Sequence, residues 1–275
     1  MPDFLDVSQH GESGVLATLV EPSWPRYLVD VGAYDGRSLS NSLPFLELGW
    51  SGVLVEPLPQ AFEQLAARYA DRPDVRCVQA ACGARPGRLP LAVGDDAPVP
   101  MTSSLRRGGG PSIEVEVETL ARLLEREWAP ADFSLLLLDT EGMDGDVLEG
   151  LDFGSHRPRV VVTENDASDR AAHDAEERLL IDRGYVLYTV VAATNSIWVS
   201  ADHAPRAAEL PLSSDDALAR VDSRTLARRC AELERSRDDI WRELSVLQSS
   251  RSWRLTKPLR AAGERARALR RGPGR

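Results

Sequence analysis

Three acidic residues, Glu56, Asp139 and Glu164, each stand directly after a short apolar run that reads as a buried strand. In an open α/β sheet the carboxyl ends of the parallel strands form the edge at which ligands bind. Carboxylates at such an edge can accept hydrogen bonds from hydroxyl groups, take up a proton or bind a hard divalent cation. Their positions therefore predict a site for a polar ligand at one edge of a sheet.

A glycine loop follows another apolar run, at residues 30–36, which read D-V-G-A-Y-D-G. Gly32 and Gly36 allow the backbone to approach a ligand closely. The loop is not G-x-G-x-x-G and lacks the Lys-Ser/Thr of a P-loop, which argues against a dinucleotide or a triphosphate. Glu56, about twenty residues further on, is placed to accept hydrogen bonds from both hydroxyls of a ribose. Together the loop and Glu56 predict an adenosine-type cofactor, and an ordinary tight strand–helix turn is the alternative.

Strands and helices alternate along most of the chain. The apolar runs that predict strands are residues 27–31, 52–55, 75–81, 133–138, 160–163, 186–191 and 197–199. The helical patterns are residues 15–20, 39–48, 60–69, 118–127, 146–151 and 171–183. This alternation predicts an α/β fold with a Rossmann-like, doubly wound, mostly parallel seven-stranded sheet, whose last two strands form a hairpin at one edge. Residues 85–111 break the rhythm and are expected to hold a short strand at 89–93 and then a loop or lid.

Residues 138–150 read L-D-T-E-G-M-D-G-D-V-L-E-G and resemble the D-x-E-G…L-x-G signature of the FkbM methyltransferases. The glycine loop, the Glu56-Pro57 strand end and residues 160–164 also fall where that family has them. The resemblance extends over roughly residues 27–199. It implies a class I enzyme that transfers a methyl group from S-adenosylmethionine to a hydroxyl, often on a sugar, a glycolipid or a polyketide.

The resemblance also implies which residues hold the cofactor: Asp30, Gly32, Tyr34, Gly36, Glu56, Ala81 and Cys82. Asp30 and the two glycines would line its methionine end, and Glu56 would hold its ribose. Ala81 and Cys82 would flank the adenine, with Cys82 acting as a small buried residue rather than as a reactive thiol.

An alcohol is a poor nucleophile, so methyl transfer needs alignment of the reactants and removal of the hydroxyl proton. Asp139 and Glu141 are candidate bases. His173, beyond the fifth strand, is a further candidate, with an exposed helix histidine as the alternative. Asp139, Glu164 and Asn165 resemble the acid, acid and amide ligands of metal-dependent O-methyltransferases, and such oxygen ligands suit Mg²⁺ or another divalent cation. The alternative is a metal-free site in which Asp139 or Glu141 is the general base.

The net charge of −10 is an average over two unlike parts. Residues 251–275 hold nine Lys or Arg and one Glu, which gives +8 there and leaves −18 for residues 1–250. The acidic body predicts no nucleic-acid partner. The basic tail suits an anionic membrane surface or an acidic partner, or is a solvated extension. Residues 251–260 are similar to an S-x-S-W-R-x-T-x-P-L-R ending of bacterial polysaccharide-assembly enzymes, which implies a glycan or glycolipid acceptor.

A heptad pattern precedes the tail. Leu226, Leu233, Ile240 and Leu247 recur every seven residues and predict a coiled coil that forms a homo-oligomer, with a single amphipathic helix packed on its own domain as the alternative. The expected organisation is a methyltransferase domain at 1–204, a linker at 205–222, the coiled coil at 223–250 and the basic tail at 251–275. The three cysteines lack disulfide or metal spacing, and no leader or membrane span is recognisable. A cytoplasmic location is therefore expected, with the tail reaching the cytoplasmic face of the inner membrane.

Three functions stay open from the sequence. The first is O-methylation of a sugar hydroxyl on a bacterial surface glycan, polysaccharide or glycolipid. The second is O-methylation of a macrolide or polyketide-type small molecule. The third is a non-catalytic tethering subunit of a glycan-assembly complex that retains a relic fold.

Overall fold

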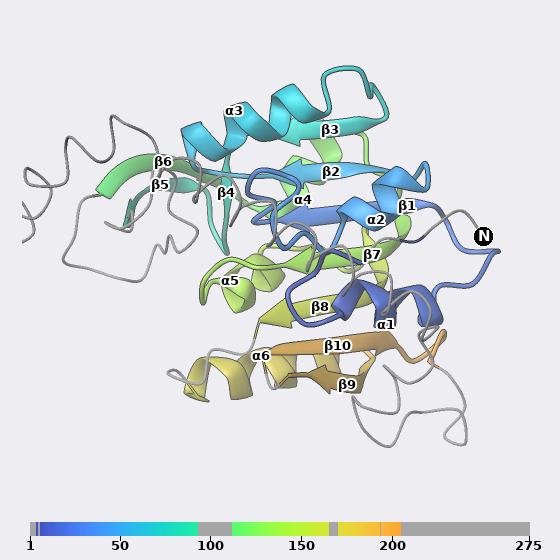
Figure 1. The fold of residues 1–275 in the computed structure, drawn as a ribbon. Coiled ribbons are helices and arrows are strands. Elements are labelled where there is room, and N and C mark those ends of the chain that lie inside the picture. Colours follow the sequence, from blue (N-terminus) through green and yellow to red (C-terminus); the bar gives the residue numbers. More distant parts are fainter. Residues whose placement is uncertain (1–3, 5, 93–111, 165–169, 193, 205–275) are drawn as a thin grey trace, which may run out of the picture. The chain divides into compact units, whose positions relative to one another are not determined.

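The computed structural model describes residue 4 and residues 6–92, 112–164, 170–192 and 194–204 (Figure 1). Its main feature is a seven-stranded sheet in the order β3-β2-β1-β7-β8-β10-β9. The strands are β1 (Tyr27–Val31), β2 (Ser51–Val55), β3 (Val75–Val78), β7 (Asp132–Leu138), β8 (Arg157–Glu164), β9 (Tyr185–Val191) and β10 (Asn195–Ser200). Neighbouring strands are parallel except that β10 runs antiparallel to both β8 and β9. The predicted doubly wound, mostly parallel sheet with an edge hairpin is confirmed.

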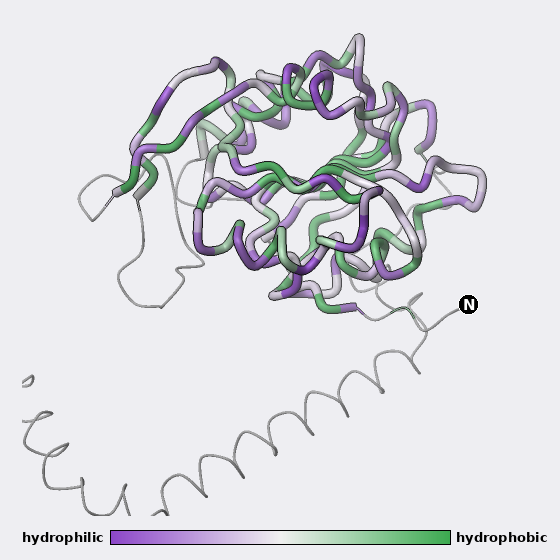
Figure 2. Tube along the Cα trace, turned by 90° about the horizontal axis from the view of Figure 1, so that it is seen from above, coloured by the Kyte–Doolittle hydropathy of each residue, from purple (hydrophilic) through white to green (hydrophobic). Residues whose placement is uncertain are grey.

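Helices cover both faces of this sheet because its central strands are apolar on both sides. Alternate residues of β1 point to opposite faces, so Leu28 packs with one cluster of buried side chains and Val29 with the other. The first cluster holds side chains of α1 (Glu12–Leu19), α2 (Leu43–Glu47) and α3 (Pro59–Arg68). The second holds side chains of α4 (Leu120–Arg126), α5 (Asp144–Glu149) and α6 (Arg170–Asp182). Figure 2 shows the resulting hydrophobic centre, where the strands are green along most of their length.

A second, three-stranded sheet lies beside the first and has the order β4-β6-β5. It consists of β4 (Ala81–Cys82), β5 (Gly87–Ala92) and β6 (Ser112–Glu118). The apolar run predicted as one strand at 75–81 is therefore divided, because Ala81 leaves the large sheet to pair with Val117 of β6. The strand expected at 89–93 exists as β5, whereas β6 was not predicted. Leu91 and Val115 of the small sheet pack against Leu58 and Ala61 of the α3 region.

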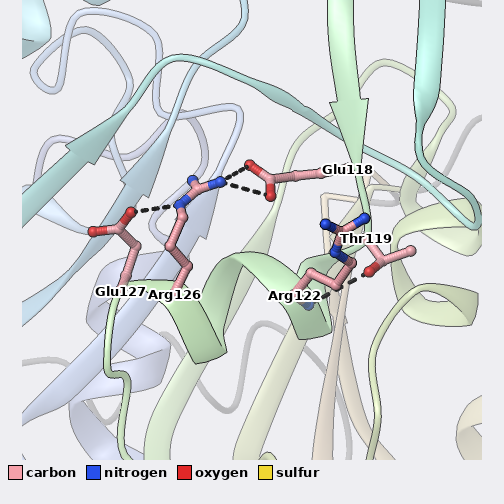
Figure 3. Close-up of polar contacts among 5 residues, drawn as sticks. All are labelled: Glu118, Thr119, Arg122, Arg126 and Glu127. Carbon is pink, nitrogen blue, oxygen red and sulfur yellow. Dashed lines mark hydrogen bonds and ion pairs between the residues drawn. The ribbon is translucent and has the colours of Figure 1, made fainter.

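The junction of β6 and α4 explains why the helix expected at 118–127 begins only at Leu120 (Figure 3). Glu118 is still part of β6, and Thr119 caps the helix by accepting a hydrogen bond from the Arg122 backbone N–H at 3.4 Å. The Arg126 guanidinium binds both carboxylate oxygens of Glu118 at 2.8 Å and Glu127 at 3.0 Å. These ion pairs join the end of β6 to the last turn of α4.

The helix expected at 39–48 is also shorter, because it begins at Leu43 with Pro44 in its first turn. Leu39 has a φ of 55°, which keeps it outside any right-handed helix. The loop predicted after 93, the linker, the coiled coil and the basic tail lie outside the described residues. Among the helices of the described part, none is both long and apolar enough to cross a membrane.

Candidate active site

The cavity that contains the predicted residues opens where the strand order reverses. From β1 the chain passes to β2 and β3 on one side and reaches β7 and β8 on the other, so β1 and β7 flank the switch point of the sheet. A cavity of about 390 Å³ lies at the carboxyl ends of these strands. Its size falls within the range of small-molecule sites in proteins, roughly 300–1,000 Å³. The residues that line it include Asp30, Gly32, Tyr34, Glu56, Ala81, Cys82, Asp139, Glu141 and Glu164.

The glycine loop is fixed between the ends of two neighbouring strands. The N–H groups of Gly32 and Ala33 donate to the Val55 carbonyl of β2 at 2.9 and 3.0 Å. Gly32 has a φ of 94°, and a Cβ atom there would lie 1.9 Å from the carbonyl oxygen of Asp139. The first loop and the end of β7 can therefore approach this closely only because residue 32 is glycine.

Unusual backbone conformations gather at the same cavity. Among the described residues, five other than glycine have a positive φ, and three of them, Tyr34, Leu39 and Glu141, line the cavity. Such conformations cost of order 1–3 kcal/mol each and are common at functional sites. Three of the five such residues in the described part of the chain thus lie at the predicted site.

Gly36 closes the loop rather than lining the cavity. Its φ is 68°, and a Cβ atom would lie 2.6 Å from the Leu65 side chain and 2.9 Å from that of Tyr69. Its N–H donates to the Ala33 carbonyl at 2.9 Å. Gly36 therefore lets the loop pack tightly on α3, which is a supporting role in the predicted cofactor site.

Asp30 is a buried acid at the end of β1, only 6% exposed. Burial raises the pKa of its carboxyl from 3.8 to about 6, although the hydrogen bond donated by the Ser42 hydroxyl favours the charged form. At neutral pH the carboxylate faces the cavity as an anion, and it can bind a cationic group such as an ammonium.

Glu56 is held by two backbone N–H groups. Tyr34 N–H donates to one carboxylate oxygen and Leu58 N–H to the other, both at 2.8 Å. Burial raises its pKa from 4.5 to about 7, against the lowering effect of these two hydrogen bonds. Each carboxylate oxygen can accept more than one hydrogen bond, so both keep acceptor capacity for a ligand that lies in the cavity.

Replacing Glu56 with glutamine should weaken cofactor binding by about 10- to 150-fold, which corresponds to the roughly 1.5–3 kcal/mol of a hydrogen bond to a charged group. The amide NH₂ would face a backbone N–H, so one of the two bonds that orient the side chain is lost. The dissociation constant of S-adenosylmethionine, measured by calorimetry, checks this. Glu63→Gln, an exposed position on α3, is the matched control and should leave the constant unchanged; equal affinity in the two variants would contradict the assignment.

The opposite wall comes from the small sheet. Ala80, Ala81 and Cys82 line the cavity together with Leu58 and, from β5, Leu91. Cys82 is 3% exposed, and burial raises the pKa of its thiol to about 12, so the thiol is neutral at physiological pH. This wall is mainly apolar and suits the flat face of an aromatic ring.

The acidic end of the cavity brings together the ends of β7 and β8. The Asp139 side chain is exposed where it lines the cavity, although many protein atoms surround its carboxyl group. Desolvation by these atoms raises the pKa of the carboxyl well above 3.8, and the negative charges of Glu164, Asp144 and Glu141 raise it further. A carboxylate with a raised pKa is a stronger base, so Asp139 can accept a proton from a bound hydroxyl.

The predicted metal site is only partly described. Asp139 and Glu164 both line the cavity, and Asn165 lies outside the described residues. Within the ranges that the structure describes, no group of three or more His, Cys, Asp or Glu side chains is arranged to hold a metal ion. Binding of a divalent cation stays a prediction.

His173 lies on α6, where its Nε2 is 3.5 Å from a carboxylate oxygen of Glu177, one helical turn further on. It is not among the residues that line the cavity. The structure therefore does not bring His173 together with Asp139 and Glu141, and these two are the candidate bases at the cavity.

The N-terminal segment forms part of the cavity wall, which the sequence did not indicate. Gln9 lines the cavity beside Asn41. Glu12 is fully buried and accepts a hydrogen bond from the Asn195 side chain of β10 at 2.7 Å, while the Ser13 hydroxyl donates to the Asn41 carbonyl at 3.1 Å. These contacts attach the segment both to β10 and to the loop before α2, so that Gln9 is held where it lines the cavity.

A buried acid on α6, Glu176, was also not predicted. It is 7% exposed, and burial together with the charge of Asp144 raises its pKa from 4.5 to about 8. The folded protein therefore binds this proton more tightly than the unfolded chain. The stabilisation of the folded protein by this bound proton is complete below about pH 4.5, and it is lost as the pH rises to about 8.

We therefore expect the free energy of unfolding of Glu176→Gln to rise relative to that of the original protein between pH 5 and pH 8. The difference should change by at most about 1.4 kcal/mol per pH unit. The neutral amide keeps the size of the protonated acid but has no proton to lose. Urea unfolding at both pH values measures the difference. Glu149→Gln, exposed on α5, should show no such trend, and a Glu176→Gln effect that is equal at both pH values would refute the assignment.

The family comparison covers most of the described sheet. Residues 30–187 match the family model described as the methyltransferase FkbM domain, whereas no curated protein matches the chain. The matched range runs from the end of β1 into β9, and thus includes Glu56, Asp139 and Glu164.

Solved structures that are similar to this chain include three proteins, each less than 25% identical to it. Fibrillarin of Aeropyrum pernix, in complex with natively bound S-adenosyl-L-methionine, is 12% identical, with 68% of this chain and 73% of that chain covered and a TM-score of 0.38. Precorrin-6y C5,15-methyltransferase of Geobacter metallireducens is 14% identical, with 68% and 86% covered and a TM-score of 0.39. The glycopeptide N-methyltransferase MtfA, complexed with S-adenosyl-L-methionine, is 14% identical, with 72% and 90% covered and a TM-score of 0.34.

Proposed function

The chain belongs to the FkbM methyltransferase family, and from this premise we propose that it transfers a methyl group from S-adenosylmethionine to a hydroxyl oxygen of a sugar. One observation supports the proposal above all. A single cavity at the switch point of the sheet has a buried, doubly hydrogen-bonded Glu56 on one side and the basic carboxylate Asp139 on the other. A nucleoside-binding group and a proton acceptor thus face one space.

The residues present fit the cofactor. Glu56 would accept hydrogen bonds from the ribose hydroxyls, and Asp30 would bind the ammonium group of the methionine part. The apolar wall around Ala81 and Leu91 would cover the adenine. S-adenosylmethionine supplies a methyl group that is already activated by its bond to a sulfonium sulfur.

What the protein must add is orientation and proton removal. Asp139 would accept the proton of the acceptor hydroxyl as the oxygen bonds to the methyl carbon and the methyl–sulfur bond breaks, which leaves S-adenosylhomocysteine. Glu141 is the second candidate for this role. Glu164 raises the pKa of Asp139 and so strengthens it as a base. A divalent cation bound by Asp139, Glu164 and Asn165 would instead bind the acceptor oxygen directly, and chelation with EDTA separates the two mechanisms.

The choice of a glycan acceptor is supported by the C-terminal sequence. Residues 251–260 are similar to an ending that occurs on bacterial polysaccharide-assembly enzymes, and the +8 charge of residues 251–275 suits an anionic surface. The heptad pattern at 223–250 favours a homo-oligomer. We therefore place the protein at the cytoplasmic face of a membrane, where such glycans are assembled.

Transfer of a labelled methyl group tests the proposal. The full chain is incubated with methyl-labelled S-adenosylmethionine and, separately, with bacterial surface oligosaccharides, glycolipids and macrolides. Label in the saccharides or glycolipids is the expected result. Label in the macrolide alone would replace the glycan acceptor by a polyketide, and cofactor binding without transfer to any acceptor would favour a tethering role.

A further inference from the structure

Asp144 is a fully buried acid at the first position of α5, with 2% exposure, and it does not line the cavity. Its carboxylate accepts three hydrogen bonds. The backbone N–H of Thr140 donates at 3.1 Å, and the Thr140 hydroxyl donates to the same oxygen. The backbone N–H of Glu164 donates to the other oxygen at 2.7 Å.

These hydrogen bonds connect two strand ends that the sheet itself no longer connects. The ladder between β7 and β8 pairs Leu137 with Val162 as its last pair. Asp139 and Glu164 each lie two residues beyond this last pair. There the Asp144 carboxylate bridges the two chain segments, because it accepts hydrogen bonds from both Thr140 and Glu164. One side chain therefore sets how far apart the two cavity acids lie.

The surroundings of Asp144 keep this connection away from water. Glu176 of α6 lies behind it, buried, and the charge of Asp144 is one cause of the raised pKa of Glu176. The two helices are also close at Gly145, where an added Cβ atom would lie 4.0 Å from the Cβ atom of Glu176. Hydrogen bonds shielded in this way are stronger and more rigid than exposed ones.

We propose that Asp144 is a positioning residue for methyl transfer, which acts through Asp139 and Glu164 by tying the ends of β7 and β8 together. This inference rests on the proposed function for its kinetic consequence. The cofactor residues Asp30 and Glu56 lie on other strand ends, so loss of the connection should affect turnover and leave cofactor binding intact.

Asp144→Asn is the most direct test. The amide oxygen can still accept from Thr140, but the amide NH₂ then faces the Glu164 N–H, and two donors cannot bond to each other. We expect kcat, measured with S-adenosylmethionine and an oligosaccharide that the original protein methylates, to fall at least tenfold. The dissociation constant of S-adenosylmethionine should change less than twofold.

Asp152→Asn is the matched control. Asp152 also accepts hydrogen bonds from a backbone N–H and a hydroxyl, those of Gly154 at 2.9 Å and Ser155 at 2.6 Å, but it lies outside the cavity. This variant should keep the original kcat. A fall in kcat of the same size in both variants would show a general loss of stability and overturn the proposal.

Two further readouts keep the proposal testable if Asp144→Asn folds poorly or if no acceptor is found. Thr140→Val removes the hydroxyl donor of Asp144 at a residue that also lines the cavity, and it should lower kcat several-fold. Amide hydrogen exchange at Glu164 should be slow in the original protein and in Asp152→Asn, and at least tenfold faster in Asp144→Asn. Unchanged exchange at Glu164 would overturn the proposal, whereas absence of methyl transfer by the original protein would overturn the proposed function instead.

Discussion

Replacing Asp139 with asparagine should lower kcat for methyl transfer by about 10²- to 10⁴-fold, the usual contribution of a general base. The amide is nearly the same size as the carboxylate, but it cannot accept the hydroxyl proton. Desolvation and the neighbouring charges of Glu164, Asp144 and Glu141 raise the pKa of Asp139 and make it a stronger base than an ordinary aspartate. The effect should appear in kcat, with the affinity for S-adenosylmethionine nearly unchanged.

Asp132→Asn is the control for this substitution. Asp132 lies at the other end of the same strand, where it pairs with Arg159 away from the cavity. Its replacement should leave kcat within about twofold of the original value. An Asp139→Asn protein with full activity would remove Asp139 from the mechanism and leave Glu141 as the base.

Gly32→Ala should both destabilise the protein and abolish measurable cofactor binding. A left-handed backbone costs a residue with a Cβ atom roughly 1–2 kcal/mol, and overpacking a tight site adds about 1–3 kcal/mol. Here the added Cβ would lie 1.9 Å from the Asp139 carbonyl oxygen, which is main chain and can yield only if the end of β7 moves. The loop that holds the cofactor and the strand end that carries the base would therefore be forced apart.

Gly49→Ala separates the two causes. Gly49 has a φ of 81°, similar to that of Gly32, but nothing lies within 4 Å of its added Cβ. It should show the conformational cost alone, with cofactor binding intact. Urea unfolding and calorimetric titration of both variants measure the difference, and a Gly32→Ala protein no more affected than Gly49→Ala would show that the close approach at Asp139 is unimportant.

The large sheet could be predicted because its strands are short, continuous apolar runs. Such runs, for example residues 133–138, need no knowledge of the neighbours that cover them. Local features that depend on partners could not be predicted in this way. Glu118 reads as a helix residue beside Leu120, yet pairing with the distant Cys82 makes it the last residue of β6.

The same distinction applies to the site. Glu56, Asp139 and Glu164 could be found because each ends an apolar run, and the topology places strand ends at one edge. Asp144 and Glu12 could not, because their roles depend on hydrogen bonds to residues far along the chain, Glu164 and Asn195. Acids with such partners look like ordinary helix-start residues in the sequence.

The proposed reaction depends above all on binding of S-adenosylmethionine in the switch-point cavity through Glu56. Calorimetric titration of the full chain with S-adenosylmethionine, beside Glu56→Gln and Glu63→Gln, measures this directly. We predict binding by the original protein and by Glu63→Gln with the same affinity, and binding weaker by about tenfold or more by Glu56→Gln. Absence of binding by the original protein, or equal affinity in all three, would contradict the account.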